Sequence, residues 1–421
     1  PGRAPAGRAA APPVSAQPRS VGGVIETLTA LELAAAIRTG GVAPREVVES
    51  ALERAARLGP TVGAFVTLTP DQARAQADRA ERALAARAGP TDPLPPVLGV
   101  PAGVKDLSLV AGAPTRFGSA AVPALVPDED DGAVARLREA GCAFIGKTTT
   151  PELGMPCYTE PDTGPPARTP WDLTRSAGGS SGGSASAVAA GIVPGALGSD
   201  GGGSIRIPAS ACGVVGLKPT RGRISWGPLG VDGAGLASLG VLTRDVRDTA
   251  AFLDILAGPC PGDQFLLPGP RTTFLDACDR PPSRLRVGVL TTPVIADVPV
   301  HTACVAAVEA TARALEGLGH DVEVAGPPVP LERWDAFRVL WSVGAAVVPV
   351  PAEAEPGLVP LTRWLREQGR AWSGVAYAQA VMDRQQMARE VAAAWAAFDV
   401  VVCPTLAQPP APVGSLRNDA D

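Results

Sequence analysis

The sequence predicts an α/β fold, and three observations support that class. Short apolar runs alternate with amphipathic helical patterns along most of the 421 residues. Hydrophobic residues make up 46% and charged residues 19% of the chain, which is typical of a soluble globular protein with a sizeable core. No apolar run reaches the roughly 18 residues of a membrane span, so a membrane protein is not expected.

The predicted elements of the N-terminal half follow from caps, helix breakers and periodicity. Thr29 and Glu32 form a capping box that begins a helix, which Gly40 and Gly41 end. Pro44 suits the first turn of a second helix. The remaining expected ranges are the end of that second helix near 58, a strand at 64–67, a helix at 71–87, an apolar run at 97–104, a helix at 132–140 and a strand at 142–145.

Small residues dominate one stretch in the middle of the chain. Residues 176–216 hold twelve glycines, many serines and almost no large side chains. A flexible linker is one interpretation, but the embedded motifs around Ser204 and Lys218 favour a segment in which backbones approach closely. After a Pro- and Gly-rich surface connection at 256–284, the α/β pattern resumes with a strand at 285–290, a helix at 302–318, a strand at 320–324, a helical region at 331–397 and a strand at 399–403.

The charge balance argues against polyanionic partners. Lys and Arg number 37 against 42 Asp and Glu, a net charge of −5, so neither a nucleic acid nor an anionic membrane is an expected partner. Only three of the basic residues are lysines, namely Lys105, Lys147 and Lys218. Because a desolvated lysine can lose its proton and arginine cannot, each is a candidate proton acceptor, with coding bias as the alternative explanation.

Histidine and cysteine patterns point away from metal and disulfide chemistry. His301 and His320 lack neighbouring ligands at zinc spacing, so no metal site is expected. The seven cysteines are odd in number and form no CxxC pair, which favours a reducing, cytoplasmic location. Residues 1–23, rich in Ala, Pro and Arg, are predicted to be a disordered tail, with an export remnant as the alternative.

The segment 141–148 matches the phosphate-binding P-loop pattern letter for letter. A P-loop needs a strand before the glycine-rich loop and a helix after it. Here a helix precedes, the variable positions read as an apolar strand, and Pro151 follows almost at once. A nucleotide-binding or non-catalytic protein that uses this segment is therefore only an alternative, and Lys147 is expected to stabilise carbonyl groups at a strand end.

Three glycine-rich pieces carry residues suited to chemistry, at 103–106, 178–184 and 200–206. Consecutive glycines before Ser204 let backbone N–H groups converge where a tetrahedral oxyanion would form, which makes Ser204 a candidate nucleophile. A serine hydroxyl needs a base, and histidine is nearly absent. The expected base is therefore a lysine, as in Ser-Lys hydrolases.

These three pieces resemble the amidase signature family. The match is closest over residues 99–220, and the spacings of 75 residues from Lys105 to Ser180 and 24 from Ser180 to Ser204 are similar to those of the family's Ser-Ser-Lys triad. The resemblance implies a single domain over 24–421, with a large mixed central β-sheet covered by helices on both faces. It also implies hydrolysis of a carboxamide C–N bond, with Ser204 as acyl-accepting nucleophile, Ser180 after a cis peptide bond as proton shuttle and Lys105 as general base.

The glycines before the nucleophile gain a specific role from the resemblance. The implied oxyanion hole consists of the backbone N–H groups of Gly201, Gly202, Gly203 and Ser204. Neither a metal nor an organic cofactor is implied. From their spacing across the glycines, Asp200 and Arg206 are expected to form a structural ion pair that shapes the turn.

The substrate side is described only by the resemblance. It places Glu152 to Tyr158, especially Met155 and Tyr158, together with Gly179, beside a small-molecule amide and makes the helical region 331–397 a lid. The motifs look closest to bacterial hydrolases of small or cyclic oligomeric amides, with the glutamine-hydrolysing subunit of a tRNA-dependent amidotransferase as the first alternative. A homodimer is one arrangement left open. Family members continue beyond the strand at 399–403 with a further strand and helix, so the C-terminus is expected to be either divergent or truncated.

Several of these residues also have competing structural interpretations. Ser180 could cap the helix that follows it, and Lys105 could pair with the adjacent Asp106. Cys212 lies eight residues after the proposed nucleophile but lacks a glycine-rich approach, so it is expected in the core. Lys218 is expected to be structural.

Overall fold

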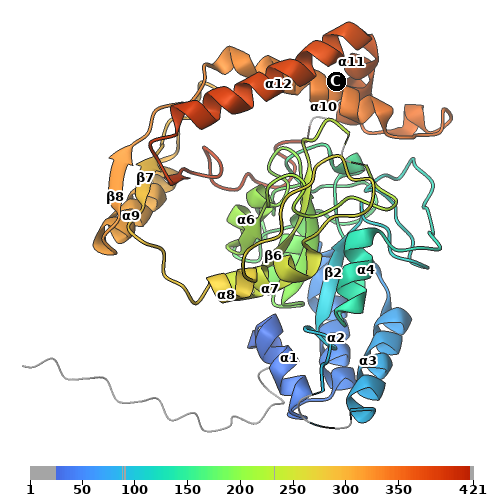
Figure 1. Cartoon of the computed structure of the whole chain (residues 1–421). Coiled ribbons are helices and arrows are strands. Elements are labelled where there is room, and N and C mark those ends of the chain that lie inside the picture. Colours follow the sequence, from blue (N-terminus) through green and yellow to red (C-terminus); the bar gives the residue numbers. More distant parts are fainter. Residues whose placement is uncertain (1–24, 88, 90–91, 232, 418–421) are drawn as a thin grey trace, which may run out of the picture.

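The computed structural model describes residues 25–87, 89, 92–231 and 233–417 (Figure 1). The tail predicted for residues 1–23 lies outside this part of the chain. Within the described residues, six strands form a mixed sheet in the order β1-β3-β2-β4-β6-β5. These strands are β1 (Phe65–Leu68), β2 (Pro101–Lys105), β3 (Ala143–Thr148), β4 (Gly195–Asp200), β5 (Val215–Leu217) and β6 (Ser238–Thr243).

The middle of this sheet is parallel and its outer strands are antiparallel. β2 pairs in parallel with both β3 and β4, whereas β1, β6 and β5 run antiparallel to their neighbours. The carboxyl ends of β2, β3 and β4 therefore lie together, at the edge where open α/β sheets bind ligands. Lys105 ends β2 and Asp200 ends β4 at that edge.

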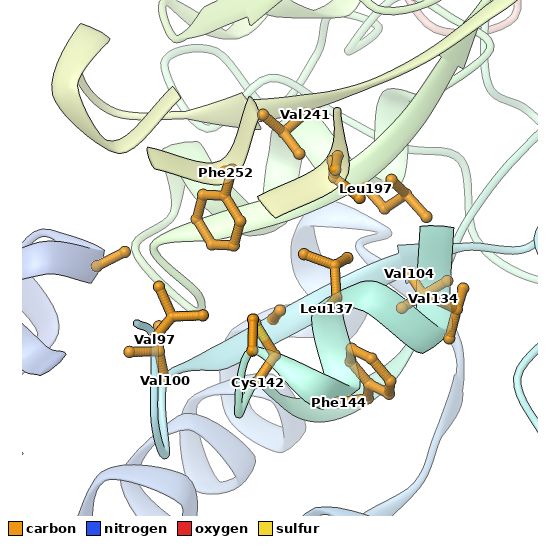
Figure 2. Packing of buried hydrophobic residues seen from close by; sticks show 14 of the residues in the cluster. Val97, Val100, Val104, Val134, Leu137, Cys142, Phe144, Leu197, Val241 and Phe252 are labelled. Atoms are coloured by element: carbon orange, nitrogen blue, oxygen red, sulfur yellow. The ribbon is translucent and has the colours of Figure 1, made fainter. Parts of the chain in front are cut away.

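Helices cover both faces of the six-stranded sheet, as the family resemblance implied. On one face Leu137 and Phe252 pack with the strand residues Val104 and Leu197 (Figure 2). On the opposite face, residues of three other helices pack around Ile145. The helices of the first face are α1 (Ala30–Arg38), α4 (Gly132–Glu139) and α7 (Val246–Leu256), and those of the second are α2 (Pro44–Val62), α3 (Pro70–Ala85) and α5 (Gly182–Ala189).

The C-terminal part of the chain adds a second, smaller sheet and a helical layer. Within the described residues the three strands of this sheet are parallel, in the order β8-β7-β9. The expected central mixed sheet is therefore present, and a separate sheet that was not predicted accompanies it. The remaining elements are α6 (Arg206–Cys212), α8 (Phe274–Ala277), β7 (Arg286–Val289), α9 (Thr302–Gly317), β8 (Asp321–Val324), α10 (Asp335–Val347), α11 (Pro360–Ala371), α12 (Gly374–Ala394) and β9 (Val400–Val402).

The helical layer lies beyond the sheet, opposite the N-terminal helices. In Figure 1, α10, α11 and α12 cross the top of the molecule, on the side away from α1, α2 and α3. They correspond to the helical region predicted at 331–397, which begins with a short 3-10 segment and has a second one between α10 and α11. In the described part of the chain, no helix is long and apolar enough to cross a membrane.

Most predicted elements are confirmed, and two of the missed strands, β4 and β6, share a cause. The capping box is present, because Thr29 accepts a hydrogen bond from Glu32 N–H and the Glu32 side chain accepts one from Thr29 N–H. β4 and β6 were not predicted, because their glycines and serines interrupt the apolar pattern of a buried strand. β3 runs on through Lys147, so the segment that matches a P-loop is a fully buried strand rather than a phosphate-binding loop.

Candidate active site

Lys105 lies at the carboxyl end of β2 with its amine surrounded by hydroxyl groups. Its Nζ donates hydrogen bonds to Ser180 Oγ at 2.8 Å, to Ser199 Oγ at 3.0 Å and to the Ser199 carbonyl at 3.4 Å. The side chain is buried, and this desolvation lowers the pKa of Lys105 to about 7, against the opposing charge of Asp200. Near neutral pH much of this amine is therefore unprotonated and can accept a proton.

Ser180 follows a cis peptide bond from Gly179, as the resemblance implied. Its side chain is buried against the Lys105 amine. The glycines after it let α5 begin close to the end of β3, because a Cβ on Gly183 would fall 2.3 Å from the Thr149 nitrogen. Ser180 does not cap α5, since Ser181 is the N-cap residue and makes no side-chain cap bond.

The loop that carries Ser204 is tied to the segment beside Ser180. The Ser181 N–H donates to the Ser204 carbonyl at 3.0 Å, which holds the two loops together. Ser204 is 8% exposed, so its side chain is largely shielded from solvent. Lys105, Ser180 and Ser204, which are distant in sequence, therefore converge at one edge of the sheet.

Asp200 organises the glycine loop that precedes Ser204. Its carboxylate accepts bonds from Gly203 N–H at 2.8 Å and Ile205 N–H at 3.1 Å. Arg206 donates to the same carboxylate from Nε at 2.8 Å and Nη2 at 2.7 Å, the ion pair expected from the sequence. Burial acts to raise the pKa of Asp200, but the hydrogen bond and charge of Arg206 outweigh burial and lower it.

The glycine loop, residues 201–203, carries backbone N–H donors next to Ser204. Gly203 has φ +124°, a conformation that favours glycine, and its N–H is occupied by Asp200. The N–H groups of Gly201, Gly202 and Ser204 make no hydrogen bond to another described residue. The Gly203 N–H, which was also expected in the oxyanion hole, is instead bonded to Asp200, so the amides of Gly201, Gly202 and Ser204 are the ones left for the predicted role.

Residues 151–158 lie beside Ser180, and we call this segment the 151–158 wall. A Cβ on Gly154 would lie 3.4 Å from Ser180 Oγ, so this backbone borders the Ser180 side chain. A Cβ on Gly179 would fall 2.5 Å from the Tyr158 carbonyl oxygen, which places Tyr158 and Gly179 in backbone contact. Met155 and Tyr158 are both half-buried.

Helix α10 places two aromatic side chains, which we call the Phe337–Trp341 wall, against the glycine loop. Phe337 and Trp341 stack with ring centroids 5.3 Å apart and an interplanar angle of 20°. A Cβ on Gly201 would lie 3.2 Å from Trp341, and one on Gly202 would lie 3.4 Å from Phe337. Part of the region predicted as a lid therefore lies directly against the oxyanion loop.

Comparison with known proteins agrees with this geometry. The family model described as Amidase matches residues 46–421. The chain belongs to the amidase signature family. It is 39% identical over 392 residues to a putative amidase of Synechocystis, a match that covers 92% of this chain and 75% of the relative. The structure of 6-aminohexanoate cyclic dimer hydrolase complexed with substrate superposes with a TM-score of 0.84 at 33% identity, over 93% of this chain and 82% of that one.

The amidotransferase alternative is supported over a shorter stretch. One component of the glutamyl-tRNA(Gln) amidotransferase of Prochlorococcus marinus is 43% identical over 255 residues, which is 60% of this chain and 51% of that protein. The resemblance to amidases extends over nearly the whole chain. This protein is thus an amidase, a hydrolase that acts on carbon–nitrogen bonds.

Lys147 of this amidase has a different partner from the one predicted. Its Nζ lies 3.1 Å from Asp106 Oδ1 and donates to Thr115 Oγ1 at 2.5 Å, so it forms a buried ion pair rather than binding strand-end carbonyls. The same pair removes Asp106 as a partner of Lys105. Cys212 is in the core as expected, where burial raises the pKa of its thiol to about 12. Lys218 donates to the Pro219 carbonyl, consistent with a structural role.

Two parts of the site were not found from the sequence. Ser199 gives the base a second hydroxyl partner, but a serine within a glycine-rich strand carries no distinguishing signal. Phe337 and Trp341 lie far along the chain from the loop that they cover, so only the fold brings them there. An i, i+4 aromatic pair on an amphipathic helix was the one available indication.

Proposed function

We propose that this amidase cleaves small amides through a covalent acyl-Ser204 intermediate, with Ser180 and Lys105 as the proton relay. The observation that carries the proposal is the Lys105 amine, which is buried, has a pKa of about 7 and lies 2.8 Å from Ser180 Oγ. A general base works best when its pKa lies near the working pH. Arginine could not take this role, because it stays protonated.

The cycle begins when Ser204 Oγ attacks the amide carbonyl carbon. The Ser204 proton passes to Ser180, and the Ser180 proton passes to Lys105. The oxyanion that forms accepts hydrogen bonds from the N–H groups of Gly201, Gly202 and Ser204, where each donor is worth roughly 10² to 10³ in rate. The C–N bond then breaks as the leaving nitrogen receives a proton from Lys105 through Ser180.

Water completes the reaction by the reverse relay. It attacks the acyl ester and gives its proton to Lys105 through Ser180. The bond between the acyl carbon and Ser204 Oγ breaks, the carboxylic acid leaves, and Ser204 regains its proton. The enzyme returns to its starting state without a net proton gain.

The substrate class proposed is a small, uncharged amide, linear or cyclic. Two observations support this class. The apolar side chains of Phe337 and Trp341 lie beside the glycine loop, and a structural neighbour is titled as a hydrolase of a cyclic 6-aminohexanoate dimer. We also propose a cytoplasmic location, which the seven free cysteines support.

An activity-based probe tests the proposed function most directly. A fluorophosphonate should label the wild-type protein at Ser204, identified by mass spectrometry, and should not label Ser204→Ala. A panel of linear and cyclic amides should then give turnover that the same substitution abolishes. The amidotransferase alternative would gain support if only glutamine released ammonia, and only with a partner protein and charged tRNA present.

A further inference from the structure

The carboxylate of Glu152 connects the 151–158 wall to the start of α11, the helix that packs on α10. Its Oε1 accepts a hydrogen bond from Ser119 Oγ at 2.7 Å, and its Oε2 accepts one from Val359 N–H at 2.9 Å. The residue is 4% exposed, so both bonds are shielded from water. Hydrogen bonds to an ionised acceptor are roughly twice as strong as neutral ones. One side chain thus connects parts of the chain 207 residues apart.

On the Ser119 side, Glu152 holds the 151–158 wall. Phe117 and Leu153 have φ values of 54° and 50°, which are unfavourable for side chains larger than glycine. The Leu153 N–H donates to the Phe117 carbonyl at 2.8 Å, so these two residues fix each other. Gly154 comes next and borders Ser180 Oγ. The strained backbone therefore lies between the Glu152 carboxylate and the proton relay.

On the Val359 side, Glu152 holds the aromatic wall. Val359 is the N-cap residue of α11, the helix that packs closely on α10. A Cβ on Gly369 of α11 would fall 2.1 Å from the Ser342 carbonyl oxygen of α10, so the two helices meet backbone to backbone. Arg366 of α11 also donates to the Ala345 carbonyl at 2.6 Å. A shift of α11 would therefore move α10 and its aromatic pair.

We propose that Glu152 is a positioning residue that sets the spacing between the 151–158 wall and the Phe337–Trp341 wall, and so decides how the amide lies against Ser204. The proposal rests on the proposed function. It assigns Glu152 no contact with the reacting atoms. A misplacement of about 1 Å in such a site can cost about 10²-fold in rate.

The test compares three variants with the full chain and two amides of different size. Glu152→Ala removes both hydrogen bonds, and kcat/KM should fall by about 10²-fold, with KM and kcat both affected and the loss unequal for the two amides. Glu152→Gln keeps an acceptor for Val359 N–H and should recover most of the activity. A matched control is Glu160→Ala, because Glu160 is also buried and accepts its bonds from Gly414 N–H rather than from α11.

Fluorophosphonate labelling of Ser204 separates positioning from general damage. The small probe should label Glu152→Ala at the wild-type rate, since the relay is intact. Hydrogen exchange at the start of α11 should be faster in Glu152→Ala and unchanged in Glu160→Ala. Equal losses of activity in Glu152→Ala and Glu160→Ala, or loss of labelling in step with amide hydrolysis, would overturn the proposal. Activity in Ser204→Ala would instead overturn the proposed function.

Discussion

Lys105 and Lys147 lie on adjacent strands of one sheet, are equally buried, and have opposite surroundings. The register pairs Lys105 with Thr148 and Val104 with Lys147, so the two amines project to opposite faces of the sheet. Lys105 meets the hydroxyls of two serines. Lys147 meets the carboxylate of Asp106.

The comparison shows that the partner, rather than burial, decides what a buried lysine can do. Burial lowers the pKa of both amines. For Lys147 the charge and hydrogen bond of Asp106 oppose the shift, and the pair serves as a structural cation and anion. For Lys105 the opposing carboxylate, Asp200, is already occupied by Arg206, and the amine remains available as a base.

Arginine substitutions at the two lysines should have the largest effects. One substitution should lower activity, and the other should lower thermal stability. Lys105→Arg should lower kcat/KM by about 10³-fold or more, because the guanidinium cannot accept the Ser180 proton. Lys147→Arg keeps the positive charge on Asp106 and should mainly lower the melting temperature, since the buried site has no room for a larger head group. Both effects are measured by amide turnover and thermal unfolding. Activity that survives Lys105→Arg would show the proposed mechanism to be wrong.

Asp106→Asn should make the Lys147 site resemble the Lys105 site. Removing the carboxylate leaves a buried amine without its counter-charge, which typically costs about 3–5 kcal/mol in the free energy of unfolding. Urea unfolding measures this loss. Folded protein should keep its rate of fluorophosphonate labelling at Ser204, because the relay does not use the pair. An Asp106→Asn protein as stable as wild type would mean that the ion pair does not hold β3 in place.

The pH dependence of kcat/KM should follow the protonation of Lys105 rather than that of Lys147. Only neutral Lys105 accepts a proton, so kcat/KM should fall about tenfold per pH unit below its pKa of about 7 and level off above it. The folded pKa lies below the ordinary value of 10.5, so the unfolded chain binds more protons between these values. The free energy of unfolding should therefore rise with pH across this window from this group. A profile flat through pH 7 would contradict the assignment of Lys105.

Ser199→Ala should have the smallest effect on kcat/KM of these substitutions. It tests how the Ser199 hydroxyl influences the pKa of Lys105. Ser199 Oγ accepts a bond from Lys105, and an acceptor favours the charged form of an amine. Its removal should move the acidic limb of the kcat/KM profile to lower pH, with a modest change in the plateau. Ser184→Ala is a suitable control, because Ser184 bonds to Thr148 and Leu197 away from the Lys105 amine. An upward shift of the limb would contradict this account.

The sequence was sufficient to select Lys105, Ser180 and Ser204, which the fold brings together, but not to predict their surroundings. The glycine-rich pieces could be assigned because their residue types and spacings are local properties of the chain. The partner of Lys147 could not, because Lys105 and Asp106 are neighbours in sequence yet successive residues of an extended chain point to opposite faces. Asp106 follows Val104 on one face, and Val104 is paired with Lys147. This relation exists only once the strand register is known.

The 151–158 wall and the Phe337–Trp341 wall could not be predicted from the sequence for a related reason. Gly154 borders Ser180 because the chain takes up positive φ values at Phe117 and Leu153, which no propensity predicts. Trp341 reaches the glycine loop through helix packing across the whole molecule. The presence of a second sheet likewise depends on long-range pairing rather than on the local pattern.

The aromatic stack of α10 belongs to the second half of the chain, while the first sheet and its loops hold every reacting group. Because of this division, the α10 face can change in sequence while the residues of the first sheet stay the same. Random mutagenesis confined to the α10 face could diversify the amides accepted while Lys105, Ser180 and Ser204 stay unchanged. Glu152 should be held constant in such a library, because its hydrogen bond to Val359 N–H positions α11 and, through α11, α10.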